Sequence, residues 1–231
     1  MGFDKAKCDR CPLKQYWKRE KCWAPVDFVH NAEDKGVLIL GEGPSKTDAQ
    51  LGVPFSDVNG IFVVEQLNAH GVESSDVSWG NIIGCRWPKD DPKTYLARLR
   101  STNRRRVKKG QKPYLSPIEA CSGHVRQNID GYKTILPMGS YATKFVYDGN
   151  PKLDAVRGGP AKLEEYKVLP TYSPSMVMRN PRFKGIFRSD VGKMLRHHRG
   201  ELNWKDPEVI FTPDYEVAKA FFEDVKGQPL A

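Results

Sequence analysis

The chain has 231 residues, of which 39% are hydrophobic and 28% charged, and its formal net charge is +9. This length allows a core that needs no disulfides, and the excess of positive charge favours an anionic partner, nucleic acid before membrane. No apolar run is long enough for a membrane-spanning helix, and the first residues lack the apolar segment of a signal peptide. We therefore expect a cytoplasmic protein, in a bacterium or a phage-infected host cell, whose five cysteines are reduced or metal-bound.

The first thirty residues are basic and contain a Cys-x-x-Cys pair, Cys8 and Cys11. Two thiolates at this spacing can converge on one metal ion or cluster. A zinc knuckle and a redox-active dithiol are the alternatives. We interpret Cys22, which falls outside the pair, as a free thiol.

The first predicted strand covers residues 36–41 and is rich in branched apolar side chains. It ends in the sequence Gly41-Glu42-Gly43-Pro44, where glycines permit a sharp turn and the close approach of a ligand. Glu42 is thus expected on a stiff loop at the carboxyl end of a strand, the edge at which open α/β sheets bind ligands. The alternative is an ordinary strand exit with a surface glutamate.

The spacing of apolar residues and the capping residues at helix ends locate the remaining helices and strands. Along the chain, short strands alternate with helices. This alternation predicts an α/β fold: a three-layer α/β/α sandwich around a central, four-stranded, mainly parallel sheet. Residues 1–200 are expected to form the main domain, and residues 201–231 a linker and a last helix. The predicted helices cover residues 57–70, 116–129, 140–147, 184–198 and 214–225, the other strands residues 81–85, 134–139 and 167–172, and a tight loop residues 173–179.

Residues 96–112 carry eight basic side chains and no acidic one. Such a run is either a mobile, solvated loop or an arm that contacts phosphates, and we prefer the arm because the whole chain is basic. Together with side chains near the predicted loops, it gives a set of candidate DNA-binding residues: Arg86, Arg104, Arg105, Arg106, Lys108, Lys109, Ser175, Met176, Met178 and Arg179.

The loops that follow the strands should gather at one rim of the sheet, where they offer groups suited to a flipped pyrimidine. Phe55 can stack on the base, and Asn81 can pair with its edge through one amide donor and one acceptor. Gly41 and Gly43 would let the base approach the backbone. Met176 and Met178 could fill the gap in the base stack, with Arg179 on a phosphate.

The order of these motifs resembles that of the family-four, iron–sulfur uracil-DNA glycosylases over about residues 5–195. The family patterns Gly-Glu-x-Pro-Gly, Gly-x-Pro-Phe and Asn-x-x-x-Cys-Arg-x-Pro match the stretches that begin at Gly41, Gly52 and Asn81. Further matches, to Glu-Ala-Cys, Leu-Gly-x-x-Ala, Arg-Gly and Pro-Thr-Tyr-His-Pro-Ser, begin at Glu119, Met138, Arg157 and Pro170. The resemblance implies that Cys8, Cys11, Cys85 and Cys121 hold a structural [4Fe–4S] cluster. Zinc would fit the same four cysteines.

Two positions depart from the family pattern. Ser173 replaces the histidine that stabilises the negative charge on the departing uracil, and Ser45 replaces a glycine. A lost electrostatic donor of this kind typically costs ~10²–10³ in rate. One subgroup becomes covalently trapped on DNA through a histidine in the insertion between the last two cysteines, but residues 86–120 contain no histidine, so we do not expect that chemistry.

The resemblance predicts a DNA glycosylase that excises uracil or a related modified pyrimidine, from single- or double-stranded DNA, with Glu42, Asp48 and Ser173 as candidate catalytic residues. Because of Ser173, the alternative is a catalytically weakened, glycosylase-fold module that binds DNA during replication. The segment from Glu208 onward resembles one that joins such domains to phage-type DNA polymerases, which suggests a polymerase or replication complex as a partner. We expect a monomer.

Overall fold

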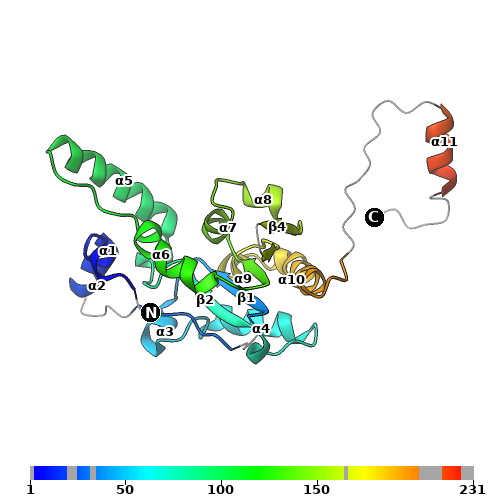
Figure 1. The fold of residues 1–231 in the computed structure, drawn as a ribbon, viewed down its shortest axis with the longest axis horizontal. Helices are drawn as coiled ribbons and strands as arrows, with labels where there is room; N and C mark the ends of the chain where they lie inside the picture. Colours follow the sequence, from blue (N-terminus) through cyan, green and yellow to red (C-terminus); the bar gives the residue numbers. More distant parts are fainter. Residues whose placement is uncertain (1–2, 20–24, 32–34, 164–165, 203–214, 225–231) are drawn as a thin grey trace.

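The structure is a computed structural model that describes residues 3–19, 25–31, 35–163, 166–202 and 215–224 (Figure 1). A central sheet carries helices on both faces. Across these ranges, no helix is both long enough and apolar enough to cross a bilayer. Cys22 and most of the predicted linker lie outside the described residues.

The sheet has five strands in the order β2-β1-β3-β5-β4, rather than the four that the sequence predicts. Four strands are parallel as expected, and β4 is an antiparallel edge strand paired with β5. Its sequence, Ala-Lys-Leu, is too short to give a periodic signal, which is why it was missed. The strands are β1 (Val37–Gly41), β2 (Ser78–Asn81), β3 (Thr134–Pro137), β4 (Ala161–Leu163) and β5 (Tyr166–Val168).

The predicted strand at residues 81–85 was wrong in position, because β2 ends at Asn81 instead of beginning there. Its sequence, Ser-Trp-Gly-Asn, contains no branched apolar residue, although all four positions are buried. The apolar pair Ile82 and Ile83 that suggested the strand is fully buried beyond its end. Buried apolar residues that follow β2 were therefore mistaken for a strand. Asn81 accordingly lies at the carboxyl end of β2 and not at the start of a strand.

The three-layer sandwich is confirmed by the way in which alternate residues of β1 enter different cores. Leu38 and Leu40 pack with helices α6 and α7, whereas Val37 and Ile39 pack with α4 and α10. Successive side chains of a strand point to opposite faces, so both faces of the sheet are covered. These helices are α4 (Val58–Asn68), α6 (Pro117–Ile129), α7 (Ser140–Val146) and α10 (Lys184–Arg199), all in predicted positions.

Most of the basic run lies in a helix, α5 (Pro92–Lys108), and not in a mobile loop, while its predicted role as an arm that contacts phosphates stays a prediction. Asp91 caps it by accepting a hydrogen bond from the Thr94 amide at 3.0 Å, and proline occupies its first position. The sequence of the run is compatible with a helix, but its high charge drew attention away from that signal. Figure 1 shows α5 projecting from the body of the protein. Residues 173–179 likewise form a short helix, α9 (Pro174–Arg179), rather than a tight loop.

The order of the strands places a topological switch point beside β1, because β2 lies on one side of it and β3 on the other. Open α/β sheets bind ligands in the crevice at such a point. The remaining elements are α1 (Lys5–Asp9), α2 (Pro12–Arg19), α3 (Lys46–Leu51), α8 (Leu153–Val156), α11 (Tyr215–Asp224), η1 (Ser74–Asp76), η2 (Pro88–Asp90) and η3 (Pro181–Phe183).

Candidate active site

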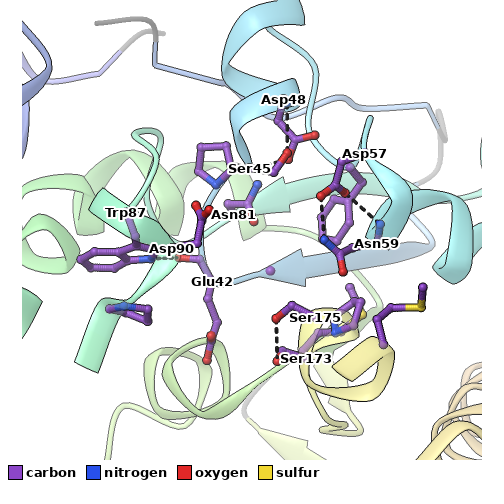
Figure 2. Close-up of a pocket in the computed structure, with 18 of the residues that line it drawn as sticks. Glu42, Ser45, Asp48, Asp57, Asn59, Asn81, Trp87, Asp90, Ser173 and Ser175 are labelled. Atoms are coloured by element: carbon purple, nitrogen blue, oxygen red, sulfur yellow. Dashed lines mark hydrogen bonds between the residues drawn. The ribbon is translucent and has the colours of Figure 1, made fainter. Parts of the chain in front are cut away.

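A cavity of about 410 Å³ opens at the carboxyl ends of the strands, on the switch point (Figure 2). It is within the size range of small-molecule sites. The sequence-predicted residues that it brings together are Gly41, Glu42, Gly43, Asp48, Phe55, Asn81, Ser173, Ser175, Met178 and Arg179.

Asn81 and Phe55 lie against the same small residue, Gly41. A Cβ atom built on Gly41 would be 2.8 Å from Cζ of Phe55 and would collide with Oδ1 of Asn81. Asn81 is paired with Gly41 across the β1–β2 ladder and is only 8% exposed. The carboxamide and the aromatic ring are therefore close together at one end of the cavity, and only glycine leaves room for both.

Phe55 adopts a backbone conformation that non-glycine residues rarely use, with φ of 58°. The centroid of its ring lies 5.2 Å from the centroid of the Trp79 ring. Such strain costs of order 1–3 kcal/mol and persists only where the surroundings impose it, most often at functional sites. The loop thus fixes the ring of Phe55 at the cavity.

Glu42 lies at the switch point, with its carboxylate held by the chain that follows β3. The Tyr141 amide donates to Oε1 of Glu42 at 2.8 Å, and Nε1 of Trp87 donates to its backbone carbonyl at 3.2 Å. Burial raises the pKa of Glu42 above its usual value, while the Tyr141 amide acts in the opposite direction. Gly139 has φ of 97°, and a Cβ there would be 2.6 Å from Cδ of Glu42. The carboxyl group is thus held in a close-fitting, partly desolvated position.

Ser173 occupies the N-cap position of α9, but its side chain makes no capping hydrogen bond. Its hydroxyl is 3.4 Å from that of Ser175 (Figure 2). The strand end before it is anchored by Thr171, whose hydroxyl donates to Oδ2 of the buried Asp190 at 2.8 Å. Asp190 in turn pairs with Arg157 at 2.9 Å. The backbone that carries Ser173 is therefore fixed, while its hydroxyl faces the cavity.

The four cysteines that the resemblance grouped together line a second, much smaller pocket. Cys8, Cys11, Cys85 and Cys121 meet there with apolar neighbours, and all four are free of disulfides. Burial raises the pKa of Cys121 to about 12, and the neighbouring cysteines add to the rise. A set of four converging thiols suits a group that binds four thiolates. Nevertheless, among the described residues no three potential ligands are placed to hold a single metal ion, so the cluster stays a prediction.

Residues 28–195 match the family model described as the uracil DNA glycosylase superfamily. The chain belongs to this superfamily. Its relatives include type-4 uracil-DNA glycosylases from Pyrobaculum aerophilum and Thermotoga maritima, each 29% identical to it. These alignments cover 80% and 75% of the chain, and 86% and 79% of the respective relative. A third, from Archaeoglobus fulgidus, is 22% identical over 88% of the chain and 92% of its own length. The predicted resemblance is thus confirmed.

The cavity residues that escaped the sequence prediction include Asp57, Asn59 and Trp87. Nδ2 of Asn59 donates to Oδ2 of Asp57 at 2.6 Å, and Asp57 also caps α4. Figure 2 shows this pair across the cavity from Glu42, with Asn59 on the side of Ser175. The Asp-Val-Asn sequence indicated a helix start, but nothing in it indicated that the Asn59 carboxamide faces a cavity.

The structure places the predicted DNA-binding residues in different surroundings. Met178 and Arg179 are exposed at the cavity, whereas Met176 packs partly buried against the core. Arg86 forms a two-bond ion pair with Asp90, with both distances 2.8 Å. The basic side chains on and just after α5 lie outside the cavity: Arg104, Arg105, Lys108 and Lys109 are exposed, whereas Arg106 packs over the ring of Tyr114.

Asp48 is buried and binds backbone amides with both carboxylate oxygens. Oδ2 accepts from the Ser45 amide at 2.9 Å, which closes a capping box on α3, and Oδ1 accepts from the Ser56 amide at 2.7 Å. This residue therefore ties the loop after β1 to the loop that carries Phe55. A positioning role accounts for all of these contacts.

Replacing Asp48 with alanine should lower the free energy of unfolding by ~2–3 kcal/mol, because two partly buried amides lose a charged acceptor. Urea denaturation of the variant and of a control with the exposed residue changed, Glu65→Ala, measures this. If Asp48→Ala instead keeps wild-type stability and loses only kcat, Asp48 acts on the substrate and not on the loops.

Proposed function

We propose that the protein is a DNA glycosylase that excises uracil or a related modified pyrimidine and leaves an abasic site. The observation that carries this proposal is the convergence of Glu42, Phe55 and Asn81 on one cavity at the switch point. Membership of the superfamily and the names of the relatives agree with it.

The base would be held by two contacts of different kinds. The Asn81 carboxamide offers one donor and one acceptor, the complement of the carbonyl and imide N–H of uracil. The ring of Phe55 offers a stacking surface. Because both lie against Gly41, the base would enter edge-on to Asn81 and close to the backbone of the loop after β1. Cytosine presents an amino group in place of the carbonyl and would mismatch the same carboxamide.

The reaction breaks the glycosidic bond and sends its electron pair to the base, which leaves an oxocarbenium-like sugar for water to attack. The Glu42 carboxylate would stabilise this cation or take the proton from the attacking water. The departing base gains negative charge on an oxygen, which a hydroxyl can stabilise only by a hydrogen bond. Ser173 is the candidate donor, and Ser175 and Asn59 supply further polar groups on that side.

The deciding experiment incubates the purified protein with oligonucleotides that contain uracil, or one of a panel of modified pyrimidines, and then cleaves abasic sites with alkali. Strand breaks at the modified position are expected. If no substrate is cleaved while the oligonucleotides still bind, the weakened DNA-binding module replaces the enzyme.

The variant Ser173→His should raise kcat on uracil ~10- to 100-fold, because an imidazole can place a charged or neutral donor where the hydroxyl is. Single-turnover excision rates on the same oligonucleotide measure the gain. Ser189→His, an exposed change on α10, is the matched control. A Ser173→His rate equal to that of the control would show that position 173 does not limit the reaction.

We further propose that Cys8, Cys11, Cys85 and Cys121 hold a [4Fe–4S] cluster, with zinc as the alternative. Bound there, it would supply a structural cross-link and no reaction step. The cysteines come from α1, from the turn before α2, from the chain after β2 and from α6, so it would fasten the N-terminal helices to the sheet. DNA is the partner that this proposal requires; the polymerase partner and the monomeric state are separate predictions.

A further inference from the structure

A second hollow, of about 440 Å³, lies next to the catalytic cavity, with η2 between them. Asp90 of η2 lines the cavity, while Pro88 and Lys89 of the same turn line the hollow. Its other walls come from α2, from α5 and from the residue Tyr114. We call it the tyrosine groove, because it is lined by the three rings of Tyr16, Tyr95 and Tyr114.

Two aromatic rings that pack against each other separate the groove from the cavity. Trp87 lines the cavity and binds the Glu42 carbonyl, and its ring centroid is 5.8 Å from that of Tyr95, which lines the groove. A polymer with one unit in the cavity would therefore reach the groove with a neighbouring unit. This continuity makes the same DNA strand the natural occupant.

One wall of the groove is held in place by contacts of its own. The Tyr114 backbone exchanges hydrogen bonds with the Asn103 side chain at 2.9 and 3.0 Å, and the Arg106 guanidinium packs 4.1 Å above the ring of Tyr114. An aromatic surface that is already ordered loses little entropy when a ligand stacks on it. Arg106, which is also predicted to contact DNA, thus contributes to the shape of the groove.

The charge at the groove also fits a nucleic acid strand. The cationic side chains of Lys89 and Arg98 line it, and the one acid among its described lining residues, Asp91, is the cap of α5. Residues 92–113 contain no acidic residue. Farther along α5, a shallower hollow is lined by Arg100, Arg104, Arg105 and Lys108, so the positive surface continues away from the cavity. Aromatic rings with cations beside them are the combination that binds single strands.

We propose that the tyrosine groove binds a nucleotide of the DNA strand adjacent to the one whose base enters the cavity. The neighbouring base stacks on a tyrosine ring, and its phosphate contacts Lys89 or Arg98. Because every base has a π-face, this contact adds affinity without selecting sequence. The inference rests on the proposed function for the identity of the polymer, but not on excision itself.

The test uses single-stranded oligonucleotides with a stable abasic analogue at the target position and 2-aminopurine at the next position on one side or the other. The variants are Tyr16→Leu and Arg98→Gln, and the matched controls are Tyr215→Leu and Arg196→Gln, which are exposed and do not line the groove. Fluorescence titrations give the dissociation constant and report stacking of the 2-aminopurine.

For Tyr16→Leu we expect about tenfold weaker binding. The change in fluorescence that reports stacking of the 2-aminopurine should also be lost at one of the two positions. Arg98→Gln should make the slope of log K against log[salt] less steep by about 0.7. The controls should bind as the wild type does. If Tyr16→Leu fails to unfold cooperatively, the exposed Arg98→Gln decides alone through its salt slope.

Two other results would overturn the proposal. If the groove variants bind the oligonucleotides as tightly as their controls, DNA does not occupy the groove, which then suits a protein segment. If the wild type does not bind the oligonucleotides at all, the proposal is rejected directly. Because the abasic analogue cannot be excised, failure of the proposed function appears separately, as uncleaved uracil in the alkali assay. A protein that binds the analogue through the groove yet excises nothing would retain this inference and lose the enzyme.

Discussion

Replacing Glu42 with glutamine should lower kcat for uracil excision by ~10²–10⁴, with little change in DNA binding. The glutamine can keep the hydrogen bond from the Tyr141 amide, so the loop after β1 should hold its shape. What it loses is the negative charge that, in the proposed mechanism, stabilises the developing sugar cation, and the capacity to take a proton from water. Single-turnover rates and anisotropy titrations on the same oligonucleotide separate the two effects.

The pH dependence gives this prediction a second readout. Burial raises the pKa of Glu42, and the proposed mechanism uses the ionised form, so the wild-type rate should rise with pH through that raised pKa and then level off. The glutamine variant should lack this acidic limb. Glu65→Gln, on the exposed face of α4, is the matched control and should keep both the rate and the limb. A Glu42→Gln enzyme within a few-fold of wild type would remove Glu42 from the mechanism.

The same raised pKa has a consequence for stability. The folded protein holds the Glu42 proton more tightly than the unfolded chain does, so this residue's contribution to stability falls as pH rises from the usual glutamate pKa through the raised one. Above that pH range the folded protein contains a buried, ionised Glu42 side chain, whereas a glutamine at this position stays neutral. Glu42→Gln should therefore be at least as stable as the wild type at neutral pH, as is common where an active site is maintained at the expense of stability.

The sequence was most informative where local chemistry and topology agree. A branched apolar run that ends in Gly-Glu-Gly-Pro correctly located β1 and placed Glu42 at its carboxyl end. The alternation of strands and helices then required a parallel sheet with helices on both faces. Together these two inferences placed the site at the rim formed by the carboxyl ends of the strands, whereas the switch point depends on the strand order and came only from the structure.

The sequence was least informative where burial or charge came from tertiary contacts. Ile82 and Ile83 are buried by the core beyond the end of β2, so their apolar character suggested a strand that begins where the real one ends. In α5, a continuous run of positive charge obscured a capped helix. Asn59 gave no signal, since its position at the cavity depends on how α4 packs. Pattern arguments cannot recover contacts that only the assembled fold creates.

Changing any one of the four pocket cysteines should remove both bound iron and a large part of the stability. Structural metal sites supply on the order of 10 kcal/mol of folding free energy, and a loss of even ~5 kcal/mol would lower Tm by ~10–20 °C in a protein of this size. Cys121→Ala is the most direct variant, because burial raises the pKa of this thiol to about 12 and so disfavours its thiolate form in the absence of a bound metal. A bound cluster would hold the thiolate form that burial alone disfavours.

The measurement compares metal content, visible absorbance and Tm for the wild type, Cys121→Ala and Cys22→Ala, the last of which changes the cysteine predicted to be a free thiol. Iron near four atoms per chain, with absorbance that oxidation bleaches, is expected for the wild type and for Cys22→Ala but not for Cys121→Ala. One zinc per chain and a colourless protein would establish the alternative occupant. If neither metal is present and Cys121→Ala melts with the control, the four thiols are core residues, and the N-terminal helices are held to the sheet by apolar packing alone.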